Sequence, residues 1–154
     1  MDDKYALIWK IRYAMRFGRR QARLLDRVAR CMKLLTFAAG TTAFASVIGD
    51  SAWQTQWSGL AVAVLAIIDG LWNPSALAAR SREMEAKFAI LNGEASSLPT
   101  ETLQKRMDHL YESELPEIES LRPIVYNDVI DELGSAQSER FTLTRWQRMV
   151  EAAA

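Results

Sequence analysis

The sequence predicts an all-α protein, in which a hairpin of two transmembrane helices is continuous with long cytoplasmic helices and is followed by short C-terminal helices. Two apolar stretches, residues 34–49 and 57–73, lie on either side of one short polar turn. No Lys or Arg occurs between Lys33 and Arg80, and a basic side chain is costly inside hydrocarbon but cheap at the interface beside it. Elsewhere apolar residues recur at helical spacing, and strand signals are absent.

Charge divides the 154 residues into three parts, although the formal net charge is zero. Residues 1–33 hold ten Lys/Arg and three Asp/Glu, a net of +7. Residues 34–78 hold two acids and no base, and residues 79–154 hold nine bases and fourteen acids, a net of −5. We therefore expect a basic amphipathic cytoplasmic helix over 1–33, a transmembrane hairpin over 34–73 and a cytoplasmic helical region over 74–154.

Residues 4–33 are expected to form one long helix. Its apolar residues recur at alternating steps of three and four, which gives a narrow seam as in coiled coils. Basic residues occupy the other faces, and no Pro interrupts the run, so the helix is predicted to continue unbroken into the first apolar stretch. The seam consists of Ile8, Ile11, Met15, Gly18, Ala22, Leu25, Ala29 and Met32.

Both apolar stretches are slightly short for a bilayer. Counted from Cys31, the first extends over roughly 28 Å at helical rise and the second over about 25 Å, against a hydrocarbon core of about 30 Å. Trp53, Trp57 and Trp72 lie at segment ends, where indole rings suit the headgroup region. The alternative is a buried hairpin in a soluble protein, but a chain of this size offers little other protein to cover two such helices.

Charge also predicts the orientation of the hairpin. Basic residues lie on the outer flanks of both stretches, whereas the connector over residues 50–56 has none. The positive-inside rule then places both termini in the cytoplasm. No secretory signal peptide is recognised, because the first apolar stretch begins far inside the chain.

The chain after the hairpin is expected to be helical and charged. Pro74 opens a helix that ends near Gly93 and runs back antiparallel to the first one, so that the apolar seams of the two helices face each other. The apolar face of this return helix contains Leu77, Met84, Phe88 and Leu91, with Ser81 among them. Shorter helices are expected over residues 99–114, 123–133 and 141–150.

No catalytic motif competes with the membrane interpretation. Asp108, His109 and Glu112 form a minimal acid–base or metal pattern, but two carboxylates near one histidine on an exposed helix are far more often solvated surface. There is no Gly-rich phosphate loop, no Ser-centred elbow and no zinc spacing. We therefore expect that the protein is not an enzyme and uses no cofactor and no metal.

The basic helix has three candidate partners: nucleic acid, anionic lipid headgroups and the acidic C-terminal part. The second and third are favoured, because the basic run adjoins an apolar stretch and the acidic partner is in the same chain. Membrane lipid is therefore an expected partner, and nucleic acid is not. The predicted headgroup contacts are Arg23, Arg27, Arg30, Lys33, Arg80 and Arg82.

Small and hydroxylated residues share one face of the first apolar stretch, and such residues permit close helix contact in lipid. They are Ala39, Thr42, Ser46 and Gly49. One interpretation is packing within a single hairpin; the other is that several hairpins assemble and the hydroxyls line a polar path. Asp69 is a functional candidate as an intramembrane acid, although near Asn73 it can also simply reach the interface. The predicted pore-lining or polar intramembrane residues are Thr42, Ser46 and Asp69.

This arrangement resembles the SLATT superfamily of bacterial membrane proteins. The resemblance rests on three parts of the sequence: the Tyr13-Ala-Met-Arg16 region, the apolar hairpin and Leu121-Arg-Pro-Ile-Val-Tyr126-Asn-Asp. The resemblance implies a basic N-terminal helix, two transmembrane helices, a return helix and a shorter helical section. It also implies a membrane effector of bacterial conflict systems, triggered by a nucleotide signal or an associated sensor, and it carries over no catalytic residue.

The sequence and the resemblance together predict a multi-pass protein of the bacterial inner membrane. Its expected function is assembly into an oligomeric pore or a membrane-disrupting effector in antiviral defence, as a homo-oligomer with a separate sensor or signalling protein as trigger. The alternatives are a non-catalytic integral-membrane subunit or adaptor of a larger complex, a phage lysis or exclusion protein, and a soluble helical adaptor.

Overall fold

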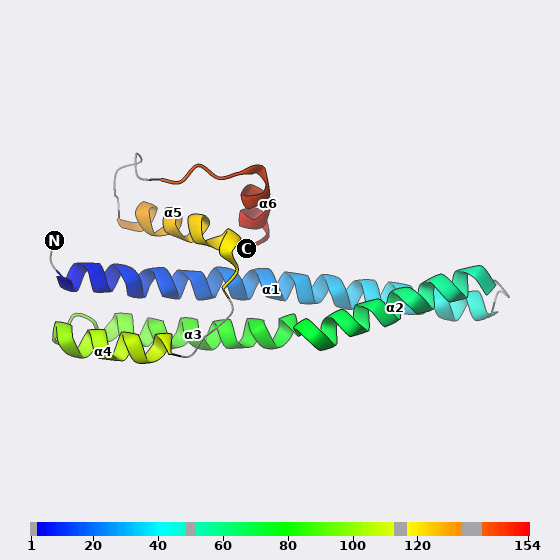
Figure 1. Ribbon diagram of the computed structural model, residues 1–154, viewed down its shortest axis with the longest axis horizontal. Coiled ribbons are helices and arrows are strands. Elements are labelled where there is room, and N and C mark those ends of the chain that lie inside the picture. Colours follow the sequence, from blue (N-terminus) through cyan, green and yellow to red (C-terminus); the bar gives the residue numbers. More distant parts are fainter. Residues whose placement is uncertain (1–2, 49–51, 113–116, 134–139) are drawn as a thin grey trace. The chain divides into compact units, whose positions relative to one another are not determined.

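The computed structural model describes residues 3–48, 52–112, 117–133 and 140–154, and it describes their side chains except at 43–48, 52, 54–56 and 133. This part of the chain is helical and contains no strand, which confirms the all-α class. Contacts divide the chain into two compact units, Leu25–Ala76 and a second one that combines Met1–Leu24 with Leu77–Ala154. In chain order the elements are α1 (Asp3–Ile48), α2 (Ala52–Trp72), α3 (Pro74–Glu94), α4 (Thr100–Tyr111), the 3-10 turn η1 (Glu119–Leu121), α5 (Arg122–Leu133) and α6 (Arg145–Ala153), as Figure 1 shows.

Helix α1 is continuous over 46 residues, so the predicted passage from the basic segment into the first apolar stretch is confirmed. None of the predicted seam residues is exposed, and Ile11, Gly18, Ala22, Leu25 and Ala29 are buried. The predicted polar connector over residues 50–56 is wrong in its second half, because α2 begins at Ala52. Nothing in the sequence of residues 52–56 opposes a helix: it contains neither Gly nor Pro, so the helix of the second stretch extends back over it.

A single residue separates α2 from α3. Asn73 adopts a left-handed backbone conformation with φ of 39°, which Asn tolerates better than most residues. Its side-chain Oδ1 accepts a hydrogen bond from the backbone N–H of Ala76 at 3.1 Å, and its own N–H donates to the carbonyl of Asp69 at 2.8 Å. Pro74 then occupies the first position of α3, where its missing N–H costs nothing.

The first core of the unit formed by residues 1–24 and 77–154 lies between α1, α3 and α4. Its buried side chains are Leu7, Ile11, Phe88, Leu91, Ala95, Leu103 and Met107. Leu7 and Ile11 pack near Phe88 and Leu91, whereas Gly18 lies against Ser81 and Glu85. Positions that rise along α1 therefore meet positions that fall along α3, which confirms the predicted antiparallel pairing of the two seams.

A second core of the same unit lies on another face of α1. It joins Phe17 of α1 to Leu121, Ile124 and Val125 at η1 and α5, and to Val150 and Ala154 at the C-terminus. Tyr13 and Leu24 pack at its edge. The first half of α1 is thus apolar on two faces, which the single predicted seam missed because the second face is built from aromatic residues placed between arginines.

The last predicted helix begins later than expected, at Arg145 rather than Phe141. Thr144 is the N-cap, in a capping box with Gln147, and this sets the helix start. The preceding residues are held instead by Asn127 of α5, whose amide donates to the Phe141 carbonyl at 3.0 Å and whose Oδ1 accepts from the Phe141 N–H at 2.8 Å. Similarly, α4 ends at Tyr111 rather than at Glu114, with Pro99 as its N-cap.

Candidate functional site: an apolar surface and a basic helix

Large apolar side chains are exposed on much of the described part of the unit formed by residues 25–76. Large apolar side chains over the second half of α1 and along α2 face outward, and Leu71 reaches 86% exposure. Soluble monomers rarely expose apolar patches beyond a few hundred Å², and larger exposed patches are typical of protein-binding or membrane-binding surfaces. The exposed side chains are Leu34, Leu35, Phe37, Trp53, Trp57, Leu60, Val64, Ile67, Ile68, Leu71 and Trp72.

Among the described residues, one helix is long and apolar enough to cross a membrane. Its apolar window lies within Trp57–Glu94, and 6% of that window is buried. A helix of this composition in the core of a soluble protein is mostly buried instead. The first apolar stretch, residues 34–49, extends into residues that the structure does not describe, and a second crossing stays a prediction.

Aromatic rings lie near both ends of α2. Trp53 and Trp57 form an edge-to-face pair with ring centroids 5.4 Å apart, and both are exposed. Trp72 is the last residue of the helix and is also exposed. This placement matches the headgroup positions that amphipathic rings favour.

The three predicted polar intramembrane residues have different surroundings. Thr42 is exposed on α1, and its hydroxyl donates to the carbonyl of Ala38 at 2.9 Å, so the helix itself satisfies that donor. Asp69 is exposed in the last turn of α2, where the negative end of the helix dipole disfavours a carboxylate. Ser46 belongs to α1, but its side chain lies outside the described residues, as does Gly49.

The predicted headgroup contacts are all exposed. Arg23, Arg27, Arg30 and Lys33 lie on α1, and the Nε of Arg30 donates to the Asp26 carbonyl at 3.4 Å. Arg80 and Arg82 lie on α3. The stem of an exposed arginine or lysine can cover the helix surface while its charged end lies toward solvent.

A different set of arginines on α1 is neutralised within the chain. Arg20 makes a two-pronged ion pair with Asp128 of α5, through Nε and Nη2 at 2.9 Å each, and these side chains are 20% and 19% exposed. Arg16 binds Glu132 at 2.7 Å, and Arg12 approaches the same carboxylate at 3.9 Å. The interpretation that the basic helix pairs with the acidic C-terminal part is therefore confirmed for these residues.

A buried polar contact joins α1 to α3 and to the segment before η1. Gln21 and Ser81 are both buried, and the Gln21 amide donates to the Ser81 hydroxyl at 3.3 Å. Ser81 donates in turn to the Leu77 carbonyl at 2.9 Å, and the N–H of Ile118 donates to Gln21 Oε1 at 3.4 Å. The sequence places Ser81 on an apolar face of its helix. It does not reveal the hydrogen-bond partner of Ser81, because Gln21 lies 60 positions away in the chain.

Burial and charge shift the acidity of two tyrosines in this unit. Burial raises the pKa of Tyr13, and the nearby Glu117 carboxylate raises it further. Burial likewise raises the pKa of Tyr111, again with Glu117 as the second cause. Both phenols therefore stay protonated at neutral pH; Tyr13 packs against the second core, whereas Tyr111 is 45% exposed.

The Asp108–His109–Glu112 pattern is spread over an exposed helix surface. His109 Nδ1 lies 3.2 Å from Glu112, with the two side chains 83% and 76% exposed. Asp108 accepts a hydrogen bond from Gln104 at 2.7 Å instead. Among the described residues, no three His, Cys, Asp or Glu side chains are grouped so as to hold a metal ion.

Two features escaped the sequence interpretation. A cavity of about 480 Å³ opens between α3 and α4, with Ile90, Leu91 and Leu110 as apolar lining and Lys87, Lys105, Arg106, His109 and Glu94 around them. Helix α6 exposes a tryptophan and a methionine.

Comparison of the chain with protein-family models, curated proteins and solved structures finds no match.

Proposed function

We propose that the protein is a two-span membrane protein with both termini in the cytoplasm. The observation that carries this proposal is the set of outward-facing apolar side chains within residues 34–37, at Trp53 and within residues 57–72. Exposing apolar side chains to lipid carries no free-energy penalty. The segment between Lys33 and Arg80 contains no Lys or Arg, so basic residues lie only at its edges. The exposed tryptophans near both ends of α2 support the same placement.

We further propose that several copies assemble into an oligomeric pore or a membrane-disrupting effector in bacterial antiviral defence. The resemblance to SLATT proteins supports this function, together with the small-residue face of α1 at Ala39 and Thr42, where helices of different copies can approach closely. Thr42, Ser46 and Asp69 are the proposed polar lining. Asp69 is the ionisable side chain of α2, and an acid within a membrane-spanning segment is a functional candidate by default.

The proposed mechanism is a population shift between a resting and an assembled state. The ion pairs of Arg16 and Arg20 with α5, and the apolar core beneath them, hold the C-terminal helices on α1. The same helix continues into the apolar stretch. A separate sensor or signalling protein that binds differently to the two arrangements of these helices would shift the population toward assembly.

Leakage of ions from liposomes tests the pore. Asp69→Ala and Thr42→Val should each lower the leakage rate per reconstituted protein, because each removes a polar group from the proposed path. Asp108→Ala, which removes an exposed acid of α4, is the matched control and should leak like the wild type. Unchanged leakage in both lining variants removes these residues from the mechanism.

A non-catalytic subunit of a larger membrane complex predicts a different result. The isolated protein would then leave liposomes tight at every protein-to-lipid ratio, and a stable partner would stay bound in mild detergent. Leakage by the purified protein alone, rising more steeply than linearly with its density in the bilayer, supports the assembled pore instead.

A further inference from the structure

Helix α6 exposes an apolar pair beside two arginines. Trp146 is 64% exposed and Met149 is 65% exposed, and a spacing of three places both side chains on one face of the helix. Arg145 and Arg148 are exposed as well. Residue 145 lies one turn before residue 149, so an arginine borders the apolar pair directly.

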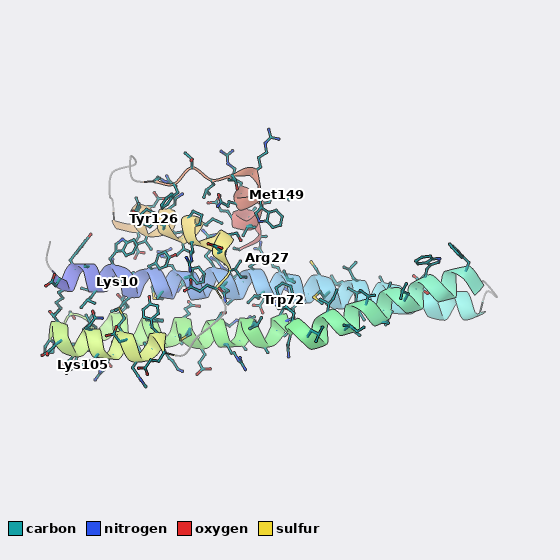
Figure 2. The ribbon with its side chains drawn as sticks, viewed as in Figure 1. Lys10, Arg27, Trp72, Lys105, Tyr126 and Met149 are labelled. Atoms are coloured by element: carbon teal, nitrogen blue, oxygen red, sulfur yellow. The ribbon has the colours of Figure 1, made fainter. Side chains whose placement is uncertain are left out.

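The neighbouring face of α6, on which Val150 lies one turn after Trp146, is packed. Val150 and Ala154 are buried in the core shared with Phe17 of α1 and Leu121 of η1. The capping box of Thr144 and Gln147 closes the N-terminus of the helix, and Arg20 donates to the Glu151 carbonyl at 3.4 Å near its C-terminus. The outward direction of Trp146 and Met149 is therefore fixed by the fold of this unit; Figure 2 labels Met149 on this helix.

The chemistry of this face matches one class of partner. Tryptophan prefers the boundary between headgroups and acyl chains, because its ring is apolar and its N–H is polar. Short helices that lie on a membrane combine such residues with arginine or lysine, which bind anionic headgroups. In the described part of the chain, no acid forms an ion pair with Arg145 or Arg148, so both charges are available to an external anion.

We propose that α6 is a lipid-binding helix that lies on the surface of an anionic membrane. Arg145 and Arg148 bind lipid phosphates, while Trp146 and Met149 enter the headgroup layer. This site goes beyond the proposed pore and does not depend on it, because a water-soluble chain would meet an anionic membrane through the same face. If α6 binds lipid in this way, the charge of the membrane lipids influences the position of the C-terminal helices, in addition to any protein partner.

A fluorophore on α6 tests the proposal in the full chain. Ala153→Cys, in a Cys31→Ser background because Cys31 is exposed, places an environment-sensitive dye one turn beyond Met149 without replacing any proposed contact. The emission is compared in nanodiscs of phosphatidylcholine and in nanodiscs that also contain phosphatidylglycerol. We expect a blue shift in the anionic nanodiscs that weakens with added salt.

Two double variants separate the contribution of the arginines to lipid binding from that of the apolar pair. Arg145→Gln/Arg148→Gln should lower the equilibrium constant for the lipid-bound state about 25-fold, at about fivefold for each arginine, and Trp146→Gln/Met149→Gln should abolish the shift. All four positions are exposed, so both variants should keep the helix content of the wild type. The control is Lys10→Gln/Lys105→Gln, which removes two exposed cations elsewhere and should keep the shift.

Three outcomes overturn the proposal. They are equal emission in both lipid mixtures, a shift that survives the loss of both arginines, and a shift that appears in detergent without lipid as protein concentration rises, which would identify a second copy as the occupant. If the chain proves to be water-soluble, the same dye is read with added vesicles, so that failure of the transmembrane hairpin is distinguished from failure of α6 to bind lipid.

Discussion

At Gly18 the backbones of α1 and α3 approach closely. A Cβ at this position would lie 2.9 Å from the Ser81 carbonyl oxygen and 3.3 Å from the Glu85 nitrogen, both of them backbone atoms that cannot turn away. Gly18→Ala should therefore destabilise the unit by about 1–3 kcal/mol through overpacking, although alanine is the better helix former. Urea unfolding in mild detergent, followed by circular dichroism, measures the change.

The control for this substitution is Gly93→Ala in α3, where an added Cβ meets nothing within 4 Å. That variant should be neutral or more stable by up to about 1 kcal/mol, because it loses only the conformational entropy of glycine. Equal effects at the two glycines would contradict the close approach of α1 and α3.

Tyr13 makes the packing on α1 sensitive to alkaline pH. Burial raises its pKa in the folded protein above its ordinary value near 10, so the folded state holds the phenolic proton more tightly than the unfolded chain does. The stability this provides is complete below about pH 10 and is lost as the pH rises through the raised value. Tyr13→Phe keeps the stacking on Trp9, whose ring centroid lies 5.5 Å away, and removes the ionisable group.

We expect Tyr13→Phe to unfold like the wild type at pH 7 and to retain more stability than the wild type above pH 10. Parallel urea titrations at several pH values measure this difference. A constant difference between the two proteins across the whole range would show that the phenol does not titrate within the fold.

At the scale of elements, the ion pair between Arg20 and Asp128 joins α1 to α5. It is two-pronged and four-fifths covered, so it should contribute more than a typical surface pair. A double-mutant cycle with Arg20→Gln and Asp128→Asn should give a coupling energy of about 1–2 kcal/mol. The same cycle on Arg140 and Asp131, a pair that is 41% and 53% exposed, should give at most a few tenths.

The elements differ in how far the sequence predicted them. The continuity of α1, its seam and its antiparallel pairing with α3 follow from local periodicity, because every third or fourth residue of one helix lies on the same face. The second apolar face of α1 and the hydrogen bonds between Asn127 and the Phe141 backbone depend on contacts between residues far apart in the chain. Periodicity carries no information about such contacts, so η1 and the non-helical segment before α6 were missed, whereas the start of α6 is set by the local capping box of Thr144 and Gln147.

The candidate site shows the same division. Composition alone located the apolar surface, since an apolar stretch of this length without Lys or Arg is visible in any sequence. It could not distinguish the arginines that bind α5 from those that stay exposed, because Arg16, Arg20, Arg23 and Arg27 look alike until Glu132 and Asp128 are placed. The exposed pair on α6 was missed because its outward direction is set by a core that includes Phe17.

For the molecule as a whole, the account depends on lipid being the solvent of the apolar surface over residues 34–72. Sedimentation of bacterial membranes that contain the full chain, before and after an alkaline carbonate wash, tests this most directly. The account predicts that the protein stays in the washed membrane pellet and leaves it only with detergent, as integral proteins do. Recovery of the chain in the wash, as a compact monomer that stays dissolved in buffer without detergent, would contradict it.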